Sequence, residues 1–151
     1  MRSIPDRINV EVNIRINVSP QTVIDAFVNP EMLGKWWGVE RAFIEPRAGG
    51  IYMLNWGISE NGIKYISTGI IASYDPGDHI HIDRYMYINP ERPILGPLHL
   101  TVHASPAERG CMVHLTQGPY PQHAGAHWDW YYEVVKDAWP KVMEGLKAFL
   151  E

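Results

Sequence analysis

The sequence predicts an α+β fold in which a curved, antiparallel sheet of seven strands wraps around one long C-terminal helix, with two short helices after the first strand. Three observations support this prediction. The first segment alternates polar and apolar residues, the middle consists of short apolar runs between turns, and the last segment repeats apolar residues every three or four positions. We assign residues 1–151 to a single domain because no linker, repeat or low-complexity tract divides them.

The first part of the chain predicts a strand followed by two helices. Residues 8–18 form the strand, because β-branched residues alternate strictly with polar ones. Ser19 and Pro20 then supply an N-cap oxygen and a first-turn proline for a helix that ends at Asn29-Pro30. A second short helix follows and ends at Gly38. Its apolar residues are Met32, Leu33, Trp36 and Trp37.

The middle of the chain predicts six further strands. Between Val39 and Gln117, turn signals rich in glycine, proline and asparagine separate short apolar runs, which is typical of successive antiparallel strands. The predicted strands are residues 39–45, 50–57, 64–74, 79–87, 98–105 and 111–117.

The last segment predicts a long amphipathic helix. Pro140 lacks the backbone donor that would bond to the carbonyl of Lys136, so we expect the helix to kink near Trp139 or to restart there. Three helices cannot cover both faces of a seven-stranded sheet. The long helix is therefore expected to cross one concave face, and a ligand would occupy the space between them. The apolar positions are Trp128, Tyr131, Val135, Trp139, Val142, Leu146 and Phe149.

Composition argues against several classes of partner. The net charge is −4 and no run of lysine or arginine occurs, so we expect neither nucleic acid nor an anionic membrane as a partner. No signal-peptide block or apolar span of roughly 20 residues is visible. Cys111, the single cysteine, can form neither an internal disulfide nor a thiolate zinc cage. We therefore expect a cytoplasmic protein that uses no metal and no cofactor.

Several short motifs occur in a characteristic order. They are Val18-Ser19-Pro20, Asn29 to Leu33 followed by Trp36-Trp37, Gly49-Gly50 with Tyr52, Gly69, and Trp139 with Leu146 and Leu150. In this order and spacing they resemble the START-like SRPBCC superfamily, and within it the homologues of the activator of the ninety-kilodalton heat-shock protein ATPase. The resemblance covers essentially the whole chain. It implies a helix-grip fold with a deep cavity, usually for a hydrophobic or aromatic molecule, in a superfamily that includes ligand carriers and cyclases such as polyketide cyclases.

Aromatic residues are the main candidates for lining this cavity. Tyr52, Leu54 and Trp56 share one face of a predicted strand, and aromatic residues recur along the last helix. Phenol and indole groups sealed from water each need a polar partner, which favours a ligand role over a purely structural core. The predicted ligand-binding residues are Trp37, Tyr52, Leu54, Trp56, Gly69, Tyr85, Trp128, Tyr131, Tyr132 and Val135.

Four of the seven histidines lie in two predicted strands. His79 and His81 are about 6.6 Å apart along one strand, and His99 and His103 are about 13 Å apart along another. If the isoleucines and leucines between them face the core, all four histidines face solvent. We expect no metal site, because no cysteine or carboxylate accompanies them at a metal-binding spacing.

The predicted function is binding of a small hydrophobic or aromatic molecule without turnover. The main alternative is a cofactor-free cyclase, dehydratase or hydrolase, whose acid or base would be His127, Asp83, Tyr131 or Tyr132. A third hypothesis is a module that activates a chaperone ATPase. A homodimer is left open.

The strand alternation is interrupted at Asp83, Arg84 and Tyr85, which predicts a bulge that turns one polar side chain inward. The other interpretation of these residues is an ion pair on the surface.

Overall fold

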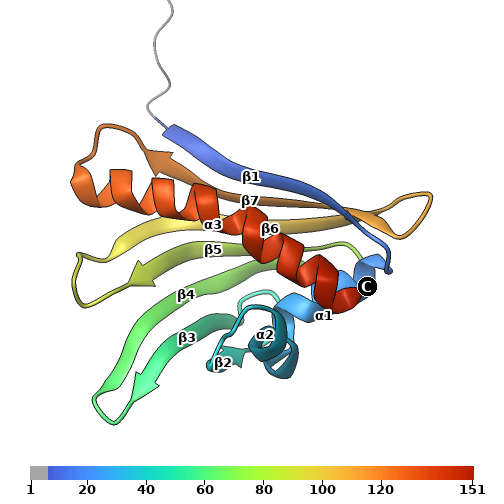
Figure 1. Cartoon of the computed structure of the whole chain (residues 1–151), viewed down its shortest axis with the longest axis horizontal. Helices are drawn as coiled ribbons and strands as arrows, with labels where there is room; N and C mark the ends of the chain where they lie inside the picture. The colour runs from blue at the N-terminus through green and yellow to red at the C-terminus, as the bar shows by residue number, and fades with distance from the viewer. Residues whose placement is uncertain (1–6) are drawn as a thin grey trace, which may run out of the picture.

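The computed structural model describes residues 7–151, which form one seven-stranded antiparallel sheet and three helices (Figure 1). The predicted fold class and order of elements are confirmed. The largest difference between a predicted and an observed strand end is in the last strand, which ends at Pro121 and not at residue 117. The strands are β1 (Arg7–Ile16), β2 (Arg41–Ile44), β3 (Ile51–Ser59), β4 (Gly62–Asp75), β5 (His79–Ile88), β6 (Leu95–Pro106) and β7 (Cys111–Pro121). The helices are α1 (Pro20–Val28), α2 (Pro30–Trp36) and α3 (Ala126–Leu150).

The sheet order is β1-β7-β6-β5-β4-β3-β2, so the first strand pairs with the last. Strands β2 to β7 follow one another as a meander, as short turns between them require. Figure 1 shows α3 lying across one face of the curved sheet, with its C-terminal end near α1 and α2. The inward side chains of the strands and the buried side of α3 form one hydrophobic core.

The two short helices begin and pack as their sequences predict. The Ser19 side chain accepts a hydrogen bond from the Thr22 amide at 3.2 Å, and the Asn29 side chain accepts one from the Met32 amide at 3.1 Å. The Tyr52 hydroxyl on β3 donates to the Phe27 carbonyl at 2.6 Å. This bond joins the last turn of α1 to the sheet, so the short helices have a fixed position at one end of the concave face.

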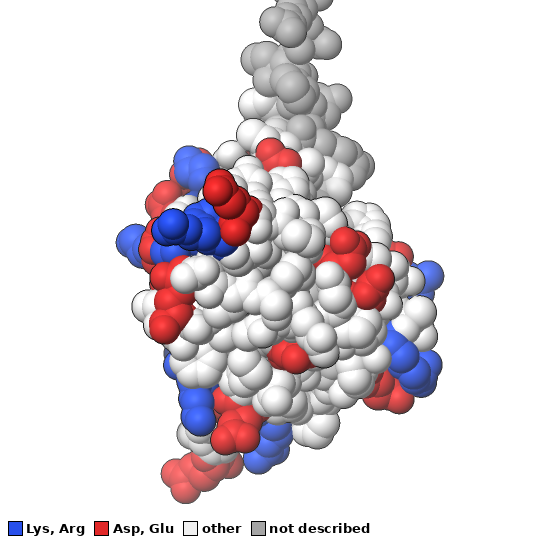
Figure 2. Space-filling view, turned by 90° about the vertical axis from the view of Figure 1, so that its right-hand side faces the viewer, with Lys and Arg blue, Asp and Glu red and all other residues white. Residues whose placement is uncertain are grey.

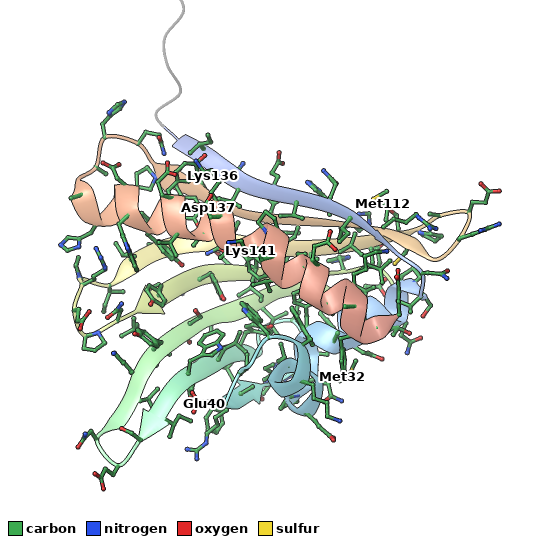
Figure 3. The ribbon with its side chains drawn as sticks, in the orientation of Figure 1. Met32, Glu40, Met112, Lys136, Asp137 and Lys141 are labelled. Carbon is green, nitrogen blue, oxygen red and sulfur yellow. The ribbon has the colours of Figure 1, made fainter. Side chains whose placement is uncertain are left out.

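Helix α3 continues through Pro140 as a single helix of 25 residues. Its ribbon changes direction about half-way along (Figure 1), so the structure follows the predicted kink and not the predicted restart. One side of α3 is buried in the core, and the opposite side carries Lys136, Asp137 and Lys141, which point to solvent (Figure 3). Within residues 7–151, no helix is long and apolar enough to cross a membrane.

A bulge in β5 lies where the sequence predicts one. The register with β6 shifts between Ile82 and Tyr85, and Arg84 has a φ of 52°. Tyr85 is the residue that turns into the core, whereas Asp83 stays on the outer face. Gly69 on β4 lies beside the bulge, where a Cβ would come within 2.6 Å of Ile82 Cγ2 and 2.8 Å of the Asp83 carbonyl oxygen. Glycine therefore lets the two backbones approach closely here.

Candidate functional site

A cavity of about 110 Å³ lies between α3 and the concave face of the sheet. Strands β4, β5 and β7 form one wall, α3 forms the other, and the residue after α2 closes one side. The lining residues are Trp37, Ser67, Tyr85, Gln117, Tyr131, Val135, Ala138, Trp139 and Val142.

Gln117 connects the two walls of the cavity. It is 2% exposed, its Nε2 donates to the Tyr131 hydroxyl at 3.1 Å, and its Oε1 accepts from Trp139 Nε1 at 2.6 Å. Gln117 follows Val113 and Leu115 in the inward alternation of β7, so the strand places an amide where a core residue would otherwise be. An amide side chain has two donor hydrogens and two acceptor positions. The two bonds to α3 leave one of each for another group in the cavity.

The titratable groups that line the cavity are phenols. Burial raises the pKa of Tyr85 to about 12, against the opposing effect of its hydrogen bond to Ser67. Burial also raises the pKa of Tyr131 well above its ordinary value. Both hydroxyls are therefore protonated at neutral pH and are suited to hydrogen bonding rather than to acting as a base. None of the nine lining residues is an acid, a histidine, a lysine or an arginine.

Trp37 forms an aromatic edge to the cavity. Its ring centroid lies 4.9 Å from that of Trp139, 5.4 Å from that of Trp36 and 5.3 Å from that of Trp56. Trp37 is half-buried, whereas Trp139 is buried. The contacts join α2, β3 and α3 through indole rings, and the half-buried Trp37 is also a lining residue of the cavity.

The structure brings together four of the ten predicted ligand-binding residues: Trp37, Tyr85, Tyr131 and Val135 line the cavity. The others lie elsewhere among the described residues. Tyr52 and Leu54 are fully buried core residues, Trp56 packs behind Trp37, and Gly69 lies at the bulge. Trp128 and Tyr132 pack around Tyr120, near the start of α3.

The sequence interpretation missed five lining residues. Two of them, Ser67 and Gln117, are polar residues at inward positions of strands, a signal that inspection of the strand alternation can detect. The remaining three are Ala138, Trp139 and Val142, which lie on the predicted apolar side of the last helix or next to it.

The candidate acid and base residues do not meet at one site. Tyr131 alone among them lines the cavity. Asp83 lies on the outer face, 3.4 Å from His99 Nδ1, as the surface-pair alternative predicts. His127 is exposed at the start of α3, where its Nδ1 lies 3.3 Å from a guanidinium nitrogen of Arg92. Tyr132 is half-buried outside the cavity.

The four strand histidines all lie on the outer face of the sheet, as expected from the isoleucines and leucines between them. Adjacent strands bring them closer than their spacing along each strand indicates. His81 Nε2 lies 3.0 Å from His99 Nδ1, and Asp78 contacts both His79 and His103. Partial burial, followed by the charge of His99, lowers the pKa of His81. Among residues 7–151, no group of three or more histidine, cysteine or acidic residues has a metal-binding arrangement.

Charged side chains give no large area of one sign on the face that Figure 2 shows. Lysines and arginines are intermixed there with acidic residues around a broad uncharged area. This face therefore gives no indication of a site for a highly charged partner.

A curved antiparallel sheet closed by a long C-terminal helix, with two short helices after the first strand, is the architecture of a helix-grip, START-like domain. The family model described as "Activator of Hsp90 ATPase homolog 1-like protein" matches residues 17–151, and the chain belongs to this family. The resemblance inferred from the motifs is thus confirmed. A search of curated proteins gave no match.

Solved structures of low sequence identity share the fold. A Mesorhizobium loti protein has a TM-score of 0.74 at 16% identity, covering 95% of this chain and 96% of its own. A Chromobacterium violaceum protein has a TM-score of 0.70 at 22% identity, with the same two coverages of 95% and 96%. The Aha1 dimer from Colwellia psychrerythraea has a TM-score of 0.69 at 15% identity, again covering 95% and 96%.

Proposed function

We propose that the protein binds a small aromatic molecule with one or two polar groups in the cavity between α3 and the sheet. The observation that carries this proposal is the composition of the walls: indole, phenol and aliphatic groups surround the side chains of Ser67 and Gln117, without a charged side chain among the lining residues. An uncharged, mostly apolar wall with a few placed polar groups is typical of small-molecule sites.

The size of the cavity restricts the ligand. Ligand sites for drug-sized molecules have volumes of roughly 300–1,000 Å³, whereas an engineered apolar cavity of about 150 Å³ is enough to hold benzene. A cavity of about 110 Å³ therefore favours a molecule with a single ring. A larger ligand requires displacement of Trp37 or of the helix.

The polar groups of the cavity indicate how such a ring would be oriented. Gln117 retains one donor and one acceptor position after its bonds to Tyr131 and Trp139. The Ser67 and Tyr85 hydroxyls lie on the same wall. We expect a hydroxyl or amide group of the ligand to hydrogen bond to one of these three side chains, with the ligand ring against Trp37 and Val135.

Thermal denaturation and tryptophan emission test the proposal, with phenol, indole and benzyl alcohol as probes. A ligand that binds only the folded state at 100 times its Kd stabilises that state by about 2.7 kcal/mol, so Tm should rise. Because Trp37 and Trp139 border the cavity, emission should change with the same midpoint.

A cavity-filling variant and a matched control locate the binding site. Ala138→Leu should fill the cavity and weaken binding, whereas Ala148→Leu, at an exposed position of the same helix, should leave the affinity unchanged. The proposal fails if no probe raises Tm, or if Ala138→Leu binds a probe as tightly as the unaltered protein.

The enzyme alternative can be separated from binding at Tyr131. Tyr131→Phe removes the hydroxyl that accepts from Gln117. In a carrier this change should alter affinity by about 0.5–1.5 kcal/mol, the net value of one neutral hydrogen bond. In an enzyme that uses the phenol as an acid, the rate should fall about 100-fold or more while binding persists.

Family membership supports a second candidate function, activation of the Hsp90 ATPase, since that activity is in the family's description. Addition of the purified protein to Hsp90 tests it, and an unchanged ATPase rate argues against it.

We also propose a homodimer, by analogy with the Colwellia psychrerythraea dimer, to be measured by light scattering. A cytoplasmic location fits the single, buried Cys111, whose thiol pKa is raised by burial.

A further inference from the structure

Three polar side chains at the β4–β5 hairpin are joined in one hydrogen-bonded chain. Ser73 Oγ lies 2.6 Å from His79 Nε2, and His79 Nδ1 lies 2.7 Å from Asp78 Oδ2. A hydroxyl, an imidazole and a carboxylate in this order are the groups by which hydrolases activate a serine nucleophile. We propose that Ser73, His79 and Asp78 form a nucleophilic triad on the outer face of the sheet that hydrolyses small, activated carboxylic esters.

The carboxylate determines the tautomer of the histidine. Hydrogen bonds from His79 and His103 lower the pKa of Asp78, so this side chain is ionised at neutral pH and only accepts hydrogen bonds. His79 Nδ1 must then carry a proton toward Asp78. In the neutral ring, Nε2 is therefore the acceptor, and the Ser73 hydroxyl donates to it. This is the arrangement in which His79 can remove the proton of Ser73 as its oxygen attacks a carbonyl carbon.

An irregularity in β4 places Ser73 on the same face as His79. The register between β4 and β5 shifts between Ile71, which pairs with Ile82, and Ser73, which pairs with His81. In a regular strand, Ser73 would face the core together with Ile71, because residues two apart share a face. The extra residue directs Ser73 outward instead. Bulges often re-aim side chains beside functional sites.

The backbone and a second histidine hold the carboxylate in place. The Asp78 amide donates to the Asp75 carbonyl at 3.0 Å, and the Asp78 carbonyl accepts from the Ala104 amide at 2.8 Å. His103 Nε2 lies 3.0 Å from the other carboxylate oxygen, Asp78 Oδ1. The Asp78 backbone is thus held by the β4–β5 turn and by β6, and its two carboxylate oxygens each contact an imidazole, so His79 has a positioned partner.

The position of the triad limits its substrate. The side chains of His79 and Asp78 are 28% and 47% exposed, and Ser73 is half-buried. These residues do not line the cavity beneath α3. The triad is open to solvent, so it should react with small esters that carry a good leaving group and should select little among acyl groups.

The reaction balances with ester and water alone. Ser73 Oγ forms a bond to the carbonyl carbon while its proton passes to His79 Nε2. The bond from that carbon to the leaving oxygen then breaks, and the proton leaves with the alcohol. Water attacks the acyl-serine and gives a proton to His79, and the proton returns to Ser73 as the carboxylic acid departs.

His114 on the same outer face provides a matched comparison. Its Nε2 lies 3.4 Å from Thr116 Oγ1 and 3.5 Å from Glu11 Oε1, so hydroxyl and carboxylate both approach one nitrogen. A proton cannot pass through this ring from the hydroxyl toward the carboxylate side. If exposed imidazoles hydrolysed the ester without a triad, loss of His114 would lower the rate as much as loss of His79.

The experiment measures p-nitrophenyl acetate hydrolysis by the full chain and labelling by a fluorophosphonate, with the labelled peptide identified by mass spectrometry. We expect the label on Ser73, and initial rates at least about ten-fold lower in Ser73→Ala and in Asp78→Asn, which reverses the tautomer preference. His114→Gln should leave the rate unchanged. The proposal is overturned if the unaltered protein is not labelled on Ser73, or if Ser73→Ala hydrolyses the ester within about two-fold of the unaltered rate.

Discussion

Replacement of Gln117 by leucine should destabilise the fold through the polar groups that it leaves unpaired. Gln117 accepts from Trp139 Nε1 and donates to the Tyr131 hydroxyl, and all three residues are buried. A buried donor that loses its partner costs about 1–3 kcal/mol, and a neutral hydrogen bond contributes about 0.5–1.5 kcal/mol net. Leucine preserves most of the volume. We therefore expect the free energy of unfolding to fall by about 2–4 kcal/mol.

Urea denaturation followed by tryptophan emission measures this change, because Trp139 itself is in the network. A double-mutant cycle with Trp139→Phe should give a coupling energy of about 0.5–3 kcal/mol, since the second change removes the donor that the first leaves unpaired. Thr116→Val, at the neighbouring outward position of β7, should shift the unfolding free energy by no more than about 0.5 kcal/mol. Equal stabilities of Gln117→Leu and Thr116→Val would refute the reasoning.

Two other predictions concern stability. Tyr52→Phe should lower the free energy of unfolding by about 1–3 kcal/mol, because the Phe27 carbonyl loses its donor in the core, whereas Tyr132→Phe should have an effect below about 0.5 kcal/mol in the same denaturation assay. The pKa of His81 is lowered by burial and by His99, partly offset by Asp83. The folded state thus binds a proton less readily than the unfolded state, whose histidine pKa is about 6.5. The resulting stabilisation is complete above that pH and is lost as pH falls through the folded-state value. His81→Gln should therefore lose less stability than the unaltered protein between pH 7 and pH 5, and equal losses would contradict the assignment.

Patterns that are local in the sequence predicted most of the fold. The alternation in β1, the Ser19 cap and the periodicity of α3 each concern residues within a few positions of one another, so the chain alone specifies them. The interruption at Asp83 to Tyr85 also located the bulge. Which residue enters the core is decided by the neighbouring strand, where Gly69 leaves room, and a single-strand pattern does not contain that information.

The candidate site was harder to predict because it depends on register between distant strands. Spacing along one strand separates His99 from His103, but pairing with β5 brings His103 beside Asp78 and His99 beside His81. Likewise, Gln117 becomes a link to α3 only once β7 lies beneath Trp139. The sequence predicted that aromatic residues would gather between helix and sheet. Of the ten residues predicted to line the cavity, four do so, because strand register and the position of α3 decide which of them border it.

The pairing of β1 with β7 has a consequence for synthesis on the ribosome. Ile16 pairs with Cys111 and Arg7 with Pro121, so the first strand has no partner until about a hundred further residues have been made. At typical elongation rates of 5–20 residues per second, this delay lasts roughly 5–20 s. During that time a strand with alternating valine and isoleucine residues is available to other nascent chains and to chaperones. Translation speed across β2 to β6 should therefore influence how much of the protein reaches its native state.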